Sequence, residues 1–185
     1  MRGWLVVLIL VLLVGGAAYS SYNGLVTAEE RVNAAWSQID NQLQRRADLI
    51  PNLVATVKGY AAHEEEIFTR VAEARARLAG ATGIPEKEAA ANELEGALAR
   101  LLALVENYPN LKADANFRQL SDELAGTENR LAVARMDYNQ AVRDYNSRLR
   151  RFPTLIFARL FGFNTRPYFQ AAEGTQTAPK VEFGR

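Results

Sequence analysis

The N-terminal part of the chain is one long apolar stretch. Residues 3–28 carry no charged side chain, and residues 4–14 are apolar without exception. Trp4 begins the stretch and Tyr19 and Tyr22 close it, an arrangement typical of the aromatic belts of membrane-spanning helices. At 1.5 Å per residue, a helix from Trp4 to Tyr22 is roughly 28 Å long, which matches one hydrocarbon core. We therefore predict a transmembrane anchor over residues 1–22, with membrane contacts at Trp4, Leu8, Leu12, Tyr19 and Tyr22.

Two other readings of this stretch remain open. In a cleaved signal peptide, Arg2 would be the basic region and residues 16–18 the small-residue cleavage site. In a soluble protein, the stretch would be a buried helix. An anchor is favoured because the basic region is minimal and the tyrosines continue the helix beyond the candidate cut. Arg31, Arg45 and Arg46 follow, so the positive-inside rule modestly favours a single-pass inner-membrane protein with a cytoplasmic C-terminal part.

After the anchor, apolar residues recur every seven positions in two rows, which is the pattern of a coiled-coil seam. The rows continue across Pro51, and a proline inside a helix removes one hydrogen bond and kinks the helix. We therefore predict one long kinked helix from Leu25 to Leu78. A hairpin at residues 49–52, with Pro51 opening a new helix, remains the alternative and would return the end of the chain to its own bilayer. The first row contains Leu25, Val32, Ile39, Leu53, Tyr60, Ile67 and Ala74, the second contains Trp36, Leu43, Ile50, Val57, Val71 and Leu78, and the charged exceptions are Arg46, Glu29 and Glu64.

The following elements are also helical. Glycine and proline at residues 80–85 predict a break. A shorter helix follows from Glu86 to Asn107, with an apolar stripe at alternating steps of four and three. Residues 108–110 predict a turn, Asp114 suits an N-cap, and a last long helix runs to about residue 151. The stripe consists of Leu94, Leu98, Leu101 and Val105.

No segment alternates in the manner of a strand, so the predicted fold class is all-α. An N-terminal transmembrane helix runs into an antiparallel up-and-down helical bundle with coiled-coil-like packing. The predicted parts are the anchor at residues 1–22, the bundle at residues 23–170 and an extended polar tail at residues 171–185.

A basic and aromatic stretch precedes the polar tail. No acidic residue lies between Asp144 and Glu173, although five arginines and several aromatic side chains do. Such an amphipathic stretch can lie on a membrane surface or fill a groove on a partner. The alternative is that its apolar side chains cap the bundle. The candidates for a membrane or partner contact are Arg150, Arg151, Phe157, Arg159, Phe161 and Phe163.

Composition excludes most common catalytic arrangements. There are 22 Lys and Arg residues against 21 Asp and Glu residues, and this balance argues against a general nucleic-acid binder. The chain has no cysteine, which excludes thiolate nucleophiles and cysteine zinc sites. It has one histidine, His63, whereas a metal site in a bundle needs a second. Because no nucleophile stands beside a base, we expect a non-enzymatic protein without metal or cofactor.

Polar residues in the middle of the chain form a second group of candidates. Arg46 falls on a core row, and a buried arginine must be paired with an acid to offset the cost of removing its charge from water. Its candidate partners are Glu123, Glu128 and Asp137. An intramolecular salt bridge that fixes register is favoured over a contact between subunits. The full set of interaction or structural candidates is Arg45, Arg46, Asp48, Pro51, Asn52, Glu128, Asn129 and Asn139.

Ordered motifs along almost the whole chain resemble the signature of the LemA family. One motif runs from Arg45 to Val54, and another runs from Tyr108 to Ala113. The resemblance implies a bacterial single-pass membrane protein with a helical-bundle domain, and it implies no enzymatic role and no catalytic residues. The remaining motifs are residues 22–26, 35–39, 56–58, 60, 63–64, 123–124, 126–129, 134–135, 138–139, 141–142, 145–146, 152–153, 161–163 and 167–169.

The anchor, the heptad rows and the basic aromatic stretch together favour a self-associating scaffold or membrane-organising protein. Its predicted partners are the lipid bilayer and further copies of the chain, with no nucleic acid. The alternative is a regulatory adaptor that binds another membrane or signalling protein through its helical faces.

Overall fold

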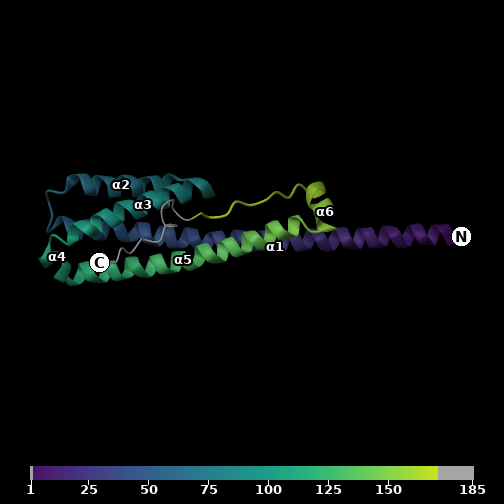
Figure 1. Ribbon diagram of the computed structural model, residues 1–185, viewed down its shortest axis with the longest axis horizontal. Helices are drawn as coiled ribbons and strands as arrows, with labels where there is room; N and C mark the ends of the chain where they lie inside the picture. Colours follow the sequence, from purple (N-terminus) through teal and green to yellow (C-terminus); the bar gives the residue numbers. More distant parts are fainter. Residues whose placement is uncertain (1, 171–185) are drawn as a thin grey trace, which may run out of the picture. The chain divides into compact units, whose positions relative to one another are not determined.

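The computed structural model describes residues 2–170, which contain helices and no strand (Figure 1). The all-α prediction is confirmed, whereas the predicted tail at residues 171–185 lies outside the described residues. By their internal contacts the described residues divide into two units, residues 2–46 with 123–168 and residues 47–122 with 169–170. The predicted domain boundaries stay a prediction. The helices are α1 (Arg2–Lys58), α2 (Glu65–Gly80), α3 (Ile84–Val105), α4 (Pro109–Ala113), α5 (Ala115–Leu149) and α6 (Thr154–Phe161).

The beginning of α1 is an exposed apolar rod. Residues 3–16 are all exposed, with Trp4 at 76% and Leu8 at 46% as the extremes among the large apolar side chains before Gly15. Among the described residues, α1 is the one helix long and apolar enough to cross a membrane. The alternative of a helix buried in the protein's own core is wrong. An apolar surface of this extent calls for an apolar environment, and its length fits a bilayer.

α1 continues without interruption through Pro51 and ends at Lys58. The alternative hairpin at residues 49–52 is therefore wrong, and so is the predicted continuation of one helix to Leu78. The chain turns at residues 59–64 instead, where the backbone N–H groups of Tyr60 and Ala61 donate to the Val57 carbonyl at 3.0 and 2.9 Å. The heptad rows concealed this turn because α1 and α2 both bury their apolar rows within the second unit.

In the first unit, α1 and α5 run antiparallel (Figure 1). The Arg148 guanidinium reaches the Gly24 carbonyl, the Trp36 and Tyr138 rings meet edge-on with 5.6 Å between centroids, and Arg130 bonds Gln42. These pairs follow one another in opposite directions along the two helices. Of the predicted heptad rows, Leu25, Val32, Ile39 and Leu43 of α1 are buried in this core. The buried residues of α5 that complete the core are Leu124, Leu131, Tyr138, Val142, Tyr145 and Leu149.

In the second unit, α2 returns along the end of α1. The Lys58 ammonium lies 5.2 Å from the centre of the Phe68 ring, and Arg75 Nε donates to the Ala47 carbonyl at 2.8 Å. α3 then packs along α2, where Arg77 and Glu93 form an ion pair. α3 confirms the predicted shorter helix, and its stripe of Leu94, Leu98, Leu101 and Val105 is buried.

The start of α5 confirms the predicted N-cap. Asp114 Oδ1 accepts the Phe117 N–H at 2.9 Å, and this hydrogen bond is the largest of the effects that hold the pKa of the Asp114 carboxyl below its usual value. The turn predicted at residues 108–110 lies at residues 106–108 instead, because Pro109 already begins α4. A proline at the first helical position loses nothing, since that N–H has no partner inside the helix.

Candidate functional site

α6 lies beside α1 where the exposed apolar stretch of α1 ends (Figure 1). The Tyr22 ring meets the rings of Phe161 and Phe163 edge-on, with 5.2 and 5.9 Å between centroids. Phe157 stacks on Phe161 at 6.4 Å. We call Tyr22, Phe157, Phe161 and Phe163 the aromatic cluster. Edge-to-face contacts are favoured for aromatic pairs, so this cluster attaches the basic aromatic stretch to α1.

A glycine ends α6 and turns the chain toward the aromatic cluster. Gly162 has a φ of 78°, in the left-handed region that favours glycine. This conformation lets the Phe163 N–H donate to the Ala158 carbonyl at 3.0 Å, as in a Schellman cap. Ala158 is buried, so α6 has one face inside the unit.

The other face of α6, with the turn before it, is exposed and apolar. Phe152 is 82% exposed, Leu160 is 75% exposed and Ile156 is 56% exposed. Exposed arginines accompany them at positions 150, 151 and 159, and no described residue forms an ion pair with these arginines. The basic aromatic stretch therefore does two things: its aromatic cluster packs on α1, and its arginines with Phe152, Ile156 and Leu160 face outward.

A polar group holds the segment after α6 against α1 and α5. The Arg166 guanidinium pairs with the Glu29 carboxylate at 2.8 Å. The buried Asn146 side chain donates to the Arg166 carbonyl and accepts from the Arg166 N–H, both at 2.9 Å, and the Tyr138 hydroxyl donates to the Pro167 carbonyl at 2.9 Å. We call Glu29, Tyr138, Asn146 and Arg166 the polar latch. Burial, followed by the charge of Glu29, raises the pKa of the neighbouring Tyr145, which therefore stays neutral.

Sequence reasoning did not single out the polar latch as a unit. Glu29 carried a signal, because it was a charged exception on an apolar row. Its partner Arg166 was seen as one arginine of the basic aromatic stretch. Nothing in the periodicity of either segment indicates that the two meet.

Arg46 pairs with Glu128 across α1 and α5. The Arg46 side chain is 8% exposed and that of Glu128 is 36% exposed, so the pair is half-buried. Of the three acids that the sequence offered, the structure brings Glu128 to Arg46. The contact lies within one chain, and a role between subunits stays a prediction.

The other candidates are spread along the two long helices. Arg45, Pro51 and Asn52 are exposed on α1, and Asp48 is exposed on the same helix. Asn129 is exposed and Asn139 half-buried on α5. Among the described residues, no three histidine, aspartate or glutamate side chains gather as a metal site would require. The candidate set therefore does not form one site.

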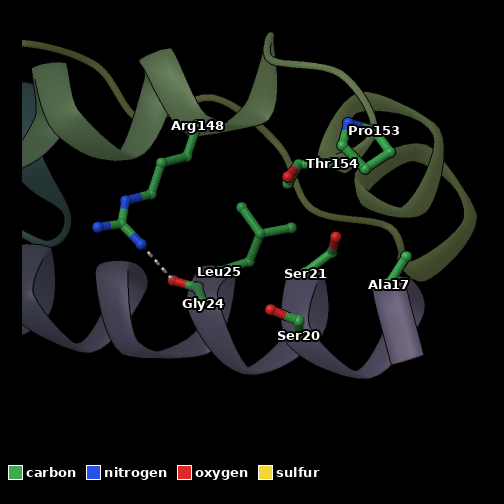
Figure 2. Close-up of a pocket in the computed structure, with 8 residues that line it drawn as sticks. All are labelled: Ala17, Ser20, Ser21, Gly24, Leu25, Arg148, Pro153 and Thr154. Atoms are coloured by element: carbon green, nitrogen blue, oxygen red, sulfur yellow. Dashed lines mark hydrogen bonds between the residues drawn. The ribbon is translucent and has the colours of Figure 1, made fainter. Parts of the chain in front are cut away.

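A pocket of about 360 Å³ opens next to the aromatic cluster (Figure 2). α1 contributes Ser20, Ser21 and Gly24 to its wall, and Arg148 and Thr154 stand opposite them. The Arg148 guanidinium donates to the Gly24 carbonyl at 3.4 Å, which is a long hydrogen bond. The pocket therefore combines one cation with three hydroxyl groups at the end of the apolar stretch.

A second, shallower groove of about 570 Å³ lies between α1 and α5 in the first unit. Its walls include small residues, and Val133 beside them is 53% exposed. The next turn of α5 also exposes Met136, at 64%. The groove is lined by Ala34, Ala35, Gln38, Gln42, Asn129, Arg130, Val133, Ala134 and Asp137.

Comparison with known proteins identifies similar chains. The model of the LemA family matches residues 35–183. The magnetosome protein MamQ 2 of Paramagnetospirillum magneticum is 30% identical over 175 residues, which cover 80% of this chain and 64% of that protein. The magnetosome protein MamQ of Magnetospirillum gryphiswaldense is 28% identical over 174 residues, with 80% and 64% covered. Protein LemA of Metamycoplasma hominis is 25% identical over 155 residues, with 82% and 69% covered. The chain thus spans 64% of the length of the MamQ proteins it matches.

Proposed function

The chain belongs to the LemA family and is a membrane-associated helical protein, and on that premise we propose that it is a non-enzymatic single-pass protein that self-associates as a scaffold at the membrane. The observation that carries the proposal is the continuity of α1. One helix supplies both the exposed apolar stretch and, from Leu25 onward, the buried row that packs against α5. Such a helix joins the bilayer to the folded part without a flexible linker.

The polar contacts of the first unit support a structural role. Arg46 pairs with Glu128, and Arg166 pairs with Glu29. Each of these ion pairs joins segments that are distant in the sequence, and Asn146 completes the second with backbone hydrogen bonds. Ion pairs between distant segments fix the register of the helices that they join, and a fixed register suits a scaffold.

The groove between α1 and α5 is the surface we propose for self-association. Alanines on both helices keep its walls low, so the backbone of another helix can approach closely, and exposed Val133 and Met136 offer apolar surface beside it. A second copy is the expected occupant, because anchors confine all copies to one plane with the same orientation. That confinement raises their effective concentration for one another.

The proposed orientation places the folded part in the cytoplasm. Arg31 follows the apolar stretch, and α6 with its neighbouring turn adds exposed arginines at the same end of the first unit. A cluster of arginines on one flank favours the cytoplasmic side. Because the chain lacks cysteine, a single Ala76→Cys variant, at an exposed position that does not line the groove, can report on this. In intact cells a membrane-impermeant maleimide should leave this cysteine unlabelled. Efficient labelling would show that the folded part lies on the opposite side of the membrane.

Mass photometry of the full chain in lipid nanodiscs or mild detergent tests self-association. We expect more than one copy per particle, with Val133→Glu shifting the population toward monomer because it puts a charge in the groove. Ala132→Glu adds the same charge at an exposed neighbour outside the groove and should change nothing. A strictly monomeric wild type refutes the scaffold. A constant one-to-one complex with a different co-purifying protein would favour the adaptor instead.

A further inference from the structure

The pocket beside the aromatic cluster has the composition of an anion site. We infer that it binds the phosphate of an anionic phospholipid in the leaflet where α1 leaves the bilayer. This inference rests on the membrane anchoring in the proposed function, and it adds a ligand class and a binding site. Its polar wall consists of Ser20, Ser21, Arg148 and Thr154.

The position of the pocket along α1 fits the headgroup region. A helix from Trp4 to Tyr22 has a length of roughly 28 Å, about one hydrocarbon core. Ser20, Ser21 and Gly24 surround Tyr22 within about one turn of helix, so they lie where the core ends and the phosphates begin. A lipid phosphate would therefore reach the pocket without leaving its leaflet.

The chemistry of the wall suits a phosphate. Ser21 is only 9% exposed, and its hydroxyl has no hydrogen-bond partner among the described residues. Figure 2 shows that hydroxyl turned into the pocket, toward Thr154. Arg148 has five N–H donors and spends one on a long bond to the Gly24 carbonyl, so most of the guanidinium is available. None of the described residues that line the pocket is acidic, so nothing in the wall repels an anion.

The surroundings of the pocket favour a lipid over free phosphate. Phe152, Ile156 and Leu160 expose apolar side chains on and beside α6, next to the exposed arginines at positions 150, 151 and 159. Apolar side chains flanked by arginines are typical of elements that lie in a membrane interface. A soluble anion would make no use of this surface, whereas a phospholipid places its glycerol and acyl chains against it.

Native mass spectrometry of the full chain, ejected from nanodiscs of equimolar phosphatidylglycerol and phosphatidylcholine, tests the inference. We expect wild-type protein to retain phosphatidylglycerol preferentially. Arg148→Gln should lower that preference roughly fivefold, the effect of one arginine at a membrane surface. Ser21→Ala should lower it in the same direction and tests the hydroxyl without changing charge. Arg143→Gln removes the same charge from an exposed position on α5 outside the pocket and should keep the preference.

Two outcomes overturn the inference. The first is an equal lipid preference in wild type, Arg148→Gln and Ser21→Ala, with circular dichroism showing that all three are folded. The second is displacement of the retained lipid by excess inorganic phosphate at the wild-type site, which would make it a site for free anion. Failure of the proposed anchoring is seen separately, since the protein would then not float with vesicles at all. Loss of self-association is also read independently, by mass photometry of the same variants.

Discussion

The Arg46–Glu128 pair leads to a prediction about which of the two side chains costs more stability when it is replaced. Arg46 is 8% exposed, whereas Glu128 is 36% exposed. Removing the partner of a buried charge costs about 3–5 kcal/mol, because the remaining charge stays in a low-dielectric site. Water reaches the Glu128 side of this pair, so we expect Glu128→Gln to cost about 2 kcal/mol.

The reverse substitution should be much milder. Arg46→Met removes the buried charge and keeps most of the side-chain volume. The carboxylate left behind at Glu128 is solvated through its exposed part, so we expect a cost under about 1 kcal/mol. The exposed neighbour Arg45 provides the control, and Arg45→Met should leave stability unchanged.

Urea unfolding in mild detergent measures these differences. Trp36 packs on Tyr138 within the same unit, so its fluorescence in a Trp4→Phe background reports on the helices that the pair joins. With a slope of about 2 kcal/mol per molar urea, Glu128→Gln should lower the unfolding midpoint by about 1 M. A Glu128→Gln variant no less stable than Arg46→Met would refute the reasoning, because it would show that Arg46 needs no partner.

Four further substitutions probe other contacts. Asn146→Ala should lower the free energy of unfolding by about 2–3 kcal/mol and speed hydrogen exchange in residues 163–168, because it leaves the Arg166 backbone groups unpaired. Glu29→Gln breaks a half-exposed ion pair and should cost under about 1 kcal/mol. Gly162→Ala should lower the free energy of unfolding by about 1 kcal/mol because of the positive φ, whereas Gly80→Ala, at a helical position with open space around it, should not lower it. The pKa of Asp114 is lowered on folding, so its stabilisation is present above the ordinary aspartate pKa and disappears as pH falls through the folded value. Unfolding curves of Asp114→Asn across this range should lack that loss, since asparagine caps without titrating.

Periodicity predicted what depends on one segment alone. The two apolar rows between Leu25 and Val57, the stripe of α3 and the cap at Asp114 each follow from local spacing or local hydrogen bonding. Periodicity did not predict the turn at residues 59–64, because two helices that share a core can keep a common seven-residue spacing across the turn that joins them. The polar latch could not be predicted for a different reason. Glu29 and Arg166 meet only after α5 has packed along α1, and the sequence around each residue does not indicate its partner.

The register of the first unit explains why the basic aromatic stretch arrives at the end of the apolar stretch. Arg46 is paired with Glu128, and from there α1 reaches back to Gly24 over 22 residues while α5 reaches forward to Arg148 over 20. At 1.5 Å per residue these distances are roughly 33 and 30 Å, so α5 runs out where the bilayer is proposed to begin. The pairing of Arg46 with Glu128 therefore sets the depth at which α6 lies. In the proposed scaffold, every copy would bring its Arg148 pocket to the same level of the same leaflet, and self-association would gather these phosphate sites into one patch of membrane.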